Sequence, residues 1–387
     1  LTWFLTAIRL IPFNALTCAA VTILCAVICF FLLRKESKEK TECFPVDRIS
    51  LIYWEELLFF LAFLMWTYLA GFRPAAYGTE KFMDYGFMEA MMRSTTLPAR
   101  DLWYSEGHIN YYYGGQYFAV FLTKLSHTKV ELTYNLMRTF VAGLAFAMPF
   151  SLVYQMMSDR MKGLQKSEKV IKGLPFAAGF TAGTAVSIAG NMHYVIYAQI
   201  IPLIEKLTGK EVSSYWFPDA TRYIGYNPYR EEDRTIHEFP CYSFVLGDLH
   251  AHVVNIMFVL LVIALLYVWL RGVRKKTVPV ETSMKDGKFW KEQLLMPHLL
   301  VISALLGMFQ WTNFWDFVIY YVVTLGTVLF ANIIRFQGKI KKIMVVTFAQ
   351  MAEIYLLAYL VILPFTLQFD TMVDGIGIAK YHSYFYQ

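Results

Sequence analysis

The chain has 387 residues, of which 57% are hydrophobic and 17% charged, and its mean hydropathy is +0.43. This composition excludes an ordinary soluble globular protein and predicts an integral membrane protein. The net charge of +6 comes without a basic patch interleaved with aromatic residues, so nucleic acid is not an expected partner. The lipid bilayer is the partner that the composition predicts.

Apolar runs long enough to cross roughly 30 Å of hydrocarbon recur along the chain. They lie at about 10–33, 51–72, 134–157, 173–206, 251–270, 296–313, 316–334 and 343–365. We therefore expect an all-α polytopic protein with one transmembrane domain over residues 1–387. The run at 10–33 is too long for a signal peptide, and because the chain begins at Leu1 rather than Met we expect a fragment or a processed product.

Lysine and arginine cluster in three connections, at 34–40, 271–276 and 335–342, which we expect on the cytoplasmic side. The same rule places an external loop at 73–113 and a second external loop at 207–252 on the other side of the cell membrane. A further basic connection at 158–172 leaves two alternatives open. It is cytoplasmic if the short segment at 113–124 is re-entrant, and it breaks the rule if that segment crosses.

The first external loop carries apolar residues at helical spacing: Phe82, Met83, Phe87, Met88, Met91 and Met92. This pattern predicts a short interfacial helix with its apolar face toward lipid. Asp84 on that helix is either a helix cap or partner for Lys81 or Arg93, or a general base that takes a proton from an acceptor hydroxyl. Asp101, after Leu97-Pro98, is either an Asx turn residue or a second catalytic carboxylate.

Three consecutive tyrosines, Tyr111, Tyr112 and Tyr113, end this loop and are followed by Gly114-Gly115. One interpretation is an aromatic belt at the membrane interface. The other is a substrate platform, because aromatic faces lie along lipid chains and sugar rings while paired glycines allow a close approach.

The second external loop adds Arg222, His237 and Glu238 as candidate substrate-binding residues. Arg222 is either a phosphate clamp or the partner of Asp219, since a guanidinium matches the oxygens of phosphate and of carboxylate.

The loop ends in Gly247-Asp248-Leu249-His250-Ala251-His252, where three ionisable side chains precede a long apolar run. Ionisable residues at such a position indicate a functional site. Three alternatives stand: Asp248 caps the following helix, the cluster contacts a phosphate or substrate, or Asp248, His250 and His252 bind a divalent metal ion. A helix would turn His250 away from the other two, which disfavours the metal.

Six stretches in order carry a resemblance: MDYGF at 83–87, LPARDLW at 97–103, INYYYGGQY at 109–117, YN at 134–135, EFPCYSFVLGDLHAHV at 238–253 and NFWD at 313–316. Together they resemble the YYY family of uncharacterised multi-spanning membrane proteins, over nearly the whole chain. The chain departs from that pattern at Phe82, Ala99, Leu102 and Ala251, where proline is usual.

The YYY proteins are in turn similar to GT-C glycosyltransferases, which use polyprenyl-phosphate-linked sugars. This similarity implies a GT-C-like bundle of about 8–10 transmembrane helices, with interfacial helices in a large first external loop and Asp84 at the catalytic position. It further implies that a sugar passes from a polyprenyl-phosphate donor to an acceptor at the external face. Trp315 and Asp316 join the expected substrate-binding residues, and cations or a metal ion would stabilise the leaving phosphate.

Two rival functions are kept. A transporter or channel would use Asp316, Glu353, His193 and the histidine cluster at 250–252 along a polar path, although few ionisable residues lie in the middle of predicted spans. A metal-dependent membrane hydrolase would need Asp248, His250 and His252 to hold zinc. The concentration of polar residues in the loops favours the transferase.

Overall fold

Long helices form most of the protein, and the computed structural model describes residues 1–38, 49–162, 168–275, 283–371, 377–378 and 380–385. Every regular element in these ranges is a helix, which confirms the all-α prediction for the described residues. Parts of the basic connections, at 39–48, 163–167 and 276–282, lie outside them.

The longest helices are α2 (Ala15–Lys38), α3 (Ile49–Ala70), α6 (Val130–Met161), α7 (Glu168–Ser187), α10 (Ala251–Lys275), α12 (Pro297–Thr312), α13 (Phe314–Phe336) and α14 (Ile340–Thr366). Six of them, α2, α3, α6, α10, α13 and α14, are long and apolar enough to cross a membrane. Joined to α11 (Gly287–Leu294) across a 50° bend, α12 makes a seventh. The protein is therefore polytopic, with fewer candidate spans among the described residues than the 8–10 expected.

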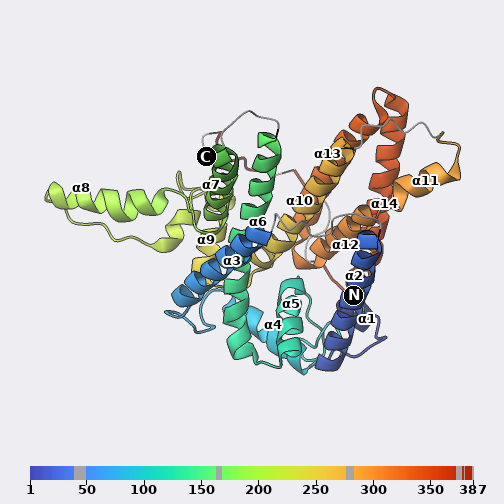
Figure 1. Ribbon diagram of the computed structural model, residues 1–387. Coiled ribbons are helices and arrows are strands. Elements are labelled where there is room, and N and C mark those ends of the chain that lie inside the picture. Colours follow the sequence, from blue (N-terminus) through green and yellow to red (C-terminus); the bar gives the residue numbers. More distant parts are fainter. Residues whose placement is uncertain (39–48, 163–167, 276–282, 372–376, 379, 386–387) are drawn as a thin grey trace.

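The apolar run at 173–206, expected as one span, is broken. After α7 ends at Ser187, helix resumes only as a π-helical turn, η2 (Val195–Ile200), which continues into α8 (Ile201–Leu207). The break contains Gly190 and Asn191, and the Asn191 amide donates to the Ala220 carbonyl at 2.7 Å. This bond ties the break to the following loop, and α8 extends away from the bundle (Figure 1).

Two short helices, α4 (Lys81–Arg93) and α5 (Gly114–Ser126), lie together at one end of the bundle beside the beginning of α6 (Figure 1). A helix of 13 residues spans only about 20 Å, so α5 is too short to cross. Because the end of α3 and the first turns of α6 meet at this same end, through the bond from Arg138 to the Ala70 carbonyl, the structure selects the re-entrant alternative.

The other end of α6 meets the end of α10. Arg271 of α10 lies 2.7 Å from the Asp159 carboxylate of α6, and the Tyr267 hydroxyl donates to the same carboxylate at 2.8 Å. The basic connections at 158–172 and 271–276 therefore begin at the same end of the bundle, opposite α4 and α5. With both at one end, the connection at 158–172 no longer breaks the rule that basic connections lie on one side of the membrane.

The shorter elements of the second loop are η3 (Phe217–Thr221), η4 (Glu231–Asp233) and α9 (Pro240–Leu246), and α1 (Thr2–Ala7) begins the chain. One core cluster joins α1, α4, α5, α6 and the start of α10, and a second joins α10, α12, α13 and α14. Between helices that span a membrane the alternative to packing is lipid, so close van der Waals contact between the side chains holds these helices together. The first core holds the candidate site.

The apolar face of α4 does not face lipid as predicted. Phe87, Met88 and Met91 are buried in the first core, and Phe82 is the exposed member of the set. The residues with helical spacing do form the helix α4. Its apolar face is covered because α5 and α6 pack against it.

Candidate functional site

The two predicted external loops meet at the end of the bundle that holds α4. The Glu80 carboxylate, just before α4, lies 3.1 Å from His250 Nε2, just before α10. Through Gln116 of α5, the Asp84 carboxylate is joined to the Leu249 carbonyl. The structure thus brings residues that are about 165 positions apart in the sequence into one cluster, which we call the two-loop site: Glu80, Lys81, Asp84, Gln116, Glu238, Asp248, His250 and His252.

Asp84 lies at the centre of this site and is fully buried. Gln116 Nε2 donates to Asp84 Oδ1 at 2.7 Å and to the Leu249 carbonyl at 2.8 Å. The other carboxyl oxygen, Asp84 Oδ2, is buried without a hydrogen-bond partner among the described residues. One oxygen is therefore held in place while the other is free for a proton or a ligand.

Burial raises the pKa of the Asp84 carboxyl to about 8, because the charged form loses its hydration. The hydrogen bond from Gln116 opposes this rise, and the nearby carboxylates of Asp248 and Glu80 add to it. Below about pH 8 the group is therefore mostly neutral. Such a value suits a group that exchanges a proton near neutral pH.

Gly114 and Gly115 explain how Gln116 reaches Asp84. A Cβ at Gly114 would lie 2.5 Å from the Thr312 methyl, and a Cβ at Gly115 would lie 2.9 Å from Val254. Both approaches are closer than real Cβ contacts, so the paired glycines let α5 pack directly against α12 and α10. The glycine pair therefore allows the close approach of neighbouring helices, one of the two kinds of approach expected from the sequence, the other being that of a ligand.

Gly247 turns the chain between α9 and the site. Its φ of 74° lies in the left-handed region, and its carbonyl accepts a 3.0 Å hydrogen bond from Arg138 Nη1. Arg138 Nη2 donates to the Ala70 and Arg73 carbonyls, both at 3.2 Å. One buried guanidinium of α6 thus fixes the end of α3 and the turn that positions Asp248.

Asp248 is not the N-cap of the next helix, as one interpretation held. After the Gly247 turn the chain stays non-helical through Leu249, and α10 begins at Ala251. The backbone N–H groups of Val253 and Val254 instead donate to the His250 carbonyl. The side chain of Asp248 is buried, and its Oδ1 has no hydrogen-bond partner among the described residues.

Each histidine of the site has its own glutamate. His250 pairs with Glu80, and His252 Nε2 lies 3.4 Å from Glu238 Oε2, which also accepts a 2.9 Å hydrogen bond from Ser243. The neighbouring His252 side chain holds the pKa of the Glu238 carboxyl below its usual range. Within the described part of the chain, no three His, Cys, Asp or Glu side chains are grouped closely enough to hold a metal ion. The pairing of each imidazole with a different glutamate gives the metal alternative no support.

The tyrosine triplet is divided between the site and the core. Tyr113 is buried in the first core, where it accepts a 3.1 Å hydrogen bond from Trp3 Nε1 and packs on Trp311. Tyr112 packs against Phe369. Tyr111 is half-buried near the site, where burial, with Glu80 and Asp84, raises its pKa to about 12.

Three other residues that the sequence predicted for the site form their hydrogen bonds with residues outside the two-loop site. Asp101 Oδ1 accepts the backbone N–H groups of Trp103 and Tyr104 at 2.7 and 2.9 Å, which is the turn role. Arg222 donates to the Pro218 carbonyl at 2.9 Å and lies over the Trp216 ring. Within the described residues it does not form the ion pair with Asp219 that was one of its two expected roles. The His237 backbone N–H donates to the Thr221 carbonyl.

Asp316 belongs to a second polar network. Its Oδ2 accepts from Asn255 at 2.6 Å and from Asn313 at 2.9 Å, and Thr312 donates to Asn255 Oδ1 at 2.8 Å. These bonds join α10, α12 and α13. The neighbouring Trp315 is 71% exposed, so it faces the surroundings rather than this network.

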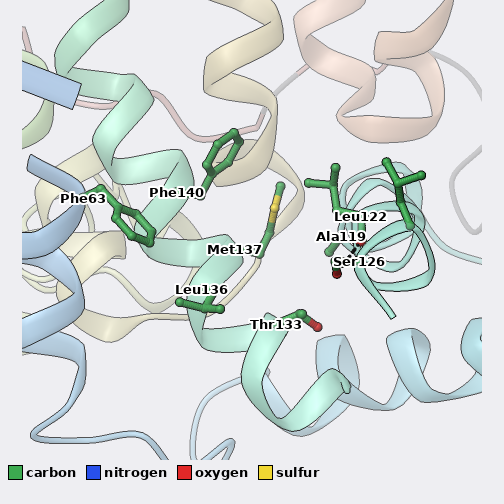
Figure 2. Close-up of a pocket in the computed structure, with 9 residues that line it drawn as sticks. Phe63, Ala119, Leu122, Ser126, Thr133, Leu136, Met137 and Phe140 are labelled. Carbon is green, nitrogen blue, oxygen red and sulfur yellow. Dashed lines mark hydrogen bonds between the residues drawn. The ribbon is translucent and has the colours of Figure 1, made fainter. Parts of the chain in front are cut away.

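An apolar groove of about 320 Å³ lies one helical turn from Gln116. Figure 2 shows its lining by side chains of α3, α5 and α6. They are Phe63, Ala119, Leu122, Leu125, Ser126, Thr133, Leu136, Met137 and Phe140. Ala119 connects the groove to the site, because it follows Gln116 by three positions on α5.

A family of membrane proteins matches the amino-acid sequence over residues 1–387. The match is to the family described as uncharacterized membrane protein (DUF2298). The chain belongs to this family. No curated protein and no solved structure matches the DUF2298 chain.

Among the residues of this DUF2298 protein that the sequence pattern missed are Gln116 and Lys81 of the two-loop site and Arg138 beside it. Gln116 is a lone amide in an otherwise apolar segment, and Arg138 is a lone cation inside a predicted span. An isolated polar residue in such a setting is a usable signal, because burial without a partner is costly. Lys81 gave no such signal, since it precedes Asp84 in a stretch already rich in charge.

Proposed function

We propose that this DUF2298 protein is a GT-C-like membrane glycosyltransferase that moves a sugar from a polyprenyl-phosphate-linked donor to an acceptor hydroxyl. The single observation that supports this function best is the Asp84 carboxyl, fully buried, with Oδ1 held by Gln116 and Oδ2 unpartnered. A carboxyl held in this way is suited to general base catalysis. In the resemblance to GT-C enzymes, Asp84 also occupies the catalytic position.

In the proposed reaction the ionised Asp84 takes the proton of the acceptor hydroxyl through Oδ2. The acceptor oxygen then forms a bond to the anomeric carbon of the sugar, while the bond from that carbon to the phosphate oxygen breaks. The bonding electrons leave with the polyprenyl phosphate, whose negative charge increases. Cationic groups near this oxygen would favour the step, since they stabilise charge that develops in the transition state.

The remaining residues of the two-loop site have supporting roles in this proposal. Gln116 positions Asp84, and the Glu80 and His250 pair joins the first loop to the segment before α10 beside it. The groove beside α5 offers an apolar surface for the lipid chain of the donor. The polar end of the donor would then lie at the end of the bundle, in keeping with a reaction at the external membrane face.

The rival transporter would need its polar residues to form a path. His193 stacks on Tyr197 at 4.4 Å, and Asp316 is held by two asparagine amides. In the described residues no hydrogen bond joins His193, Asp316 and Glu353, which lie in the loop before η2, in α13 and in α14 respectively. These contacts favour the transferase as the first function to test.

The test is a transfer assay on membranes that contain the intact protein, with a panel of labelled polyprenyl-phosphate sugars. The informative variant is Asp84→Asn, because the amide is isosteric and its carbonyl oxygen can still accept from Gln116. Asp101→Asn is the matched control, since Asp101 lies in a surface turn. We expect loss of transfer for Asp84→Asn alone. Equal transfer by wild type and Asp84→Asn would remove Asp84 as the base, and solute flux without transfer would favour the transporter.

A further inference from the structure

Lys81, the first residue of α4, is a buried lysine without a hydrogen bond. Only 7% of the residue is exposed, and none of the described residues pairs with its Nζ through a hydrogen bond or an ion pair. Its Nζ is not among the buried unpaired nitrogens of the described residues, so the stem of the side chain is covered while the ammonium keeps some accessible surface. An ammonium that bonds no described residue is available to a ligand that is not part of the chain.

The charges around Lys81 are predominantly positive. Burial is the largest cause that lowers the pKa of Lys81, followed by the positive charge of Arg138, while Asp248 raises it and Arg73 lowers it further. Lys81, Arg138 and Arg73 therefore lie within electrostatic reach of one another, with the carboxylates of Asp248 and Glu80 on the same side of the bundle. This local excess of positive charge favours an anionic ligand.

Lys81 is the cation of this group that combines a covered stem with a terminal nitrogen bonded to none of the described residues, whereas Arg73 is exposed. Both terminal nitrogens of Arg138 are already bonded to backbone carbonyls. Arg222, which the sequence suggested as the phosphate clamp, is bonded to the Pro218 carbonyl and stacked on Trp216. Because Lys81 and Asp84 are three positions apart on α4, their side chains lie on the same face of that helix.

We propose that Lys81 binds the phosphate group of the ligand that occupies the two-loop site. The identity of this anion as a phosphate rests on the proposed function, whereas the need for an anion rests on the charges. The phosphate oxygens accept hydrogen bonds from the Lys81 ammonium. The positive charges of Arg73 and Arg138 attract the phosphate from a longer distance. In the transfer reaction this contact places a positive charge at the leaving phosphate.

The experiment measures binding to the full chain purified in a neutral detergent, by titration calorimetry. The probes are a polyprenyl monophosphate, the corresponding polyprenol without phosphate, and inorganic phosphate. The variant is Lys81→Met, which keeps the length of the stem and removes the charge. The matched control is Lys124→Met, because Lys124 of α5 is equally buried but donates to the Met92 carbonyl at 2.9 Å.

We expect Lys81→Met to weaken binding of the phosphate probe by roughly tenfold or more, the usual effect of a lost charged hydrogen bond. Its melting temperature should stay about equal, because the substitution removes no hydrogen bond or ion pair between described residues. Lys124→Met should do the reverse, with lower stability and unchanged binding. Binding of inorganic phosphate alone would identify a soluble phosphate ligand, with the Lys81 contact still supported.

Unchanged phosphate binding by Lys81→Met would overturn the proposal, as would failure of the wild-type protein to bind either phosphate probe. A fall in melting temperature without a change in affinity would show that Lys81 is structural. Failure of the glycosyl transfer is separable from these results. If Lys81→Met loses phosphate binding but no donor supports transfer, the phosphate site stands and the proposed reaction falls.

Discussion

Gln116 holds Asp84 by a 2.7 Å hydrogen bond and uses its second amide proton on the Leu249 carbonyl at 2.8 Å. One side chain of α5 therefore connects α4 in the first loop with the segment that leads into α10. All three groups are buried, so each hydrogen bond replaces one that water would otherwise provide. The relationship makes the geometry of the site dependent on a residue outside both loops.

Gln116→Leu should destabilise the protein and alter Asp84. The variant leaves Asp84 Oδ1 and the Leu249 carbonyl without a donor, at a cost of about 1–3 kcal/mol for each group. We expect a lower melting temperature in detergent and, because the bond that favours the ionised form is lost, a higher pKa for the Asp84 carboxyl. Gln116→Glu keeps the length but not the donor protons of the amide. If Gln116→Leu melts at the wild-type temperature, the bridge does not contribute to stability.

The stability of the protein should fall as pH rises from about 4 to 8 because of Asp84. The folded protein keeps the Asp84 proton until about pH 8, whereas the unfolded chain releases it near the ordinary value of 3.8. Within this window the unfolded state binds fewer protons, so the free energy of unfolding decreases with pH. Asp84→Asn should make the dependence less steep. Thermal unfolding of both proteins at several pH values checks this, and parallel curves would contradict it.

The proposed transferase should become faster as pH approaches 8. The base must be ionised to accept a proton, and the free protein holds the pKa of Asp84 at about 8. We expect kcat/KM to rise with pH by close to tenfold per unit well below that value and to level off above it. The measurement is the pH profile of transfer with a fixed donor. A profile that is flat between pH 6 and 8 would assign the proton transfer to another group.

Gly247→Ala should disrupt the turn that leads to Asp248. A Cβ at this position would lie 1.9 Å from Arg138 Nη1, and the φ of 74° adds backbone strain. We expect a loss of more than about 1–3 kcal/mol, since steric overlap adds to the strain of a left-handed residue. Gly272→Ala in α10 is the control, because its Cβ would meet nothing within 4 Å and alanine favours a helix. Similar melting temperatures for the two variants would argue against the contact.

Leu136→Trp should narrow the apolar groove and change the preference for donor length. Leu136 lines the groove and is 42% exposed, so a larger ring can enter the groove without overpacking a core. If the groove holds the lipid chain, long-chain donors should lose more activity than short-chain donors. The comparison of KM for two chain lengths checks this. An equal change for both donors would place the chain elsewhere.

Several features of the fold follow from local patterns in the sequence. The length of the apolar runs predicts most of the spans, and the spacing of Phe87, Met88 and Met91 predicts α4. These patterns report which side chains leave water, but they do not report whether lipid or protein replaces it. That is why the apolar face of α4 was expected toward lipid and instead lies in the core.

Local sequence patterns also revealed the candidate site, but only in part. Asp84, Glu238, His250 and His252 stand out because ionisable residues are rare next to apolar runs. Their pairing depends on contacts between distant segments, and the sequence grouped Asp248 with the histidines because they are neighbours in the chain. In the structure His250 pairs with Glu80 and His252 with Glu238, so proximity along the chain was a poor guide to bonding.

By itself, the sequence determined that this DUF2298 protein is an all-α polytopic membrane protein, because backbone groups in hydrocarbon must be satisfied within helices. It also determined where polar residues concentrate. The tertiary structure decided that the two loops meet, that Tyr113 belongs to the core, and that Asp84 is buried beside Gln116. These properties arise from packing between elements far apart in the chain, and the pKa of a carboxyl depends on that packing because burial removes its water.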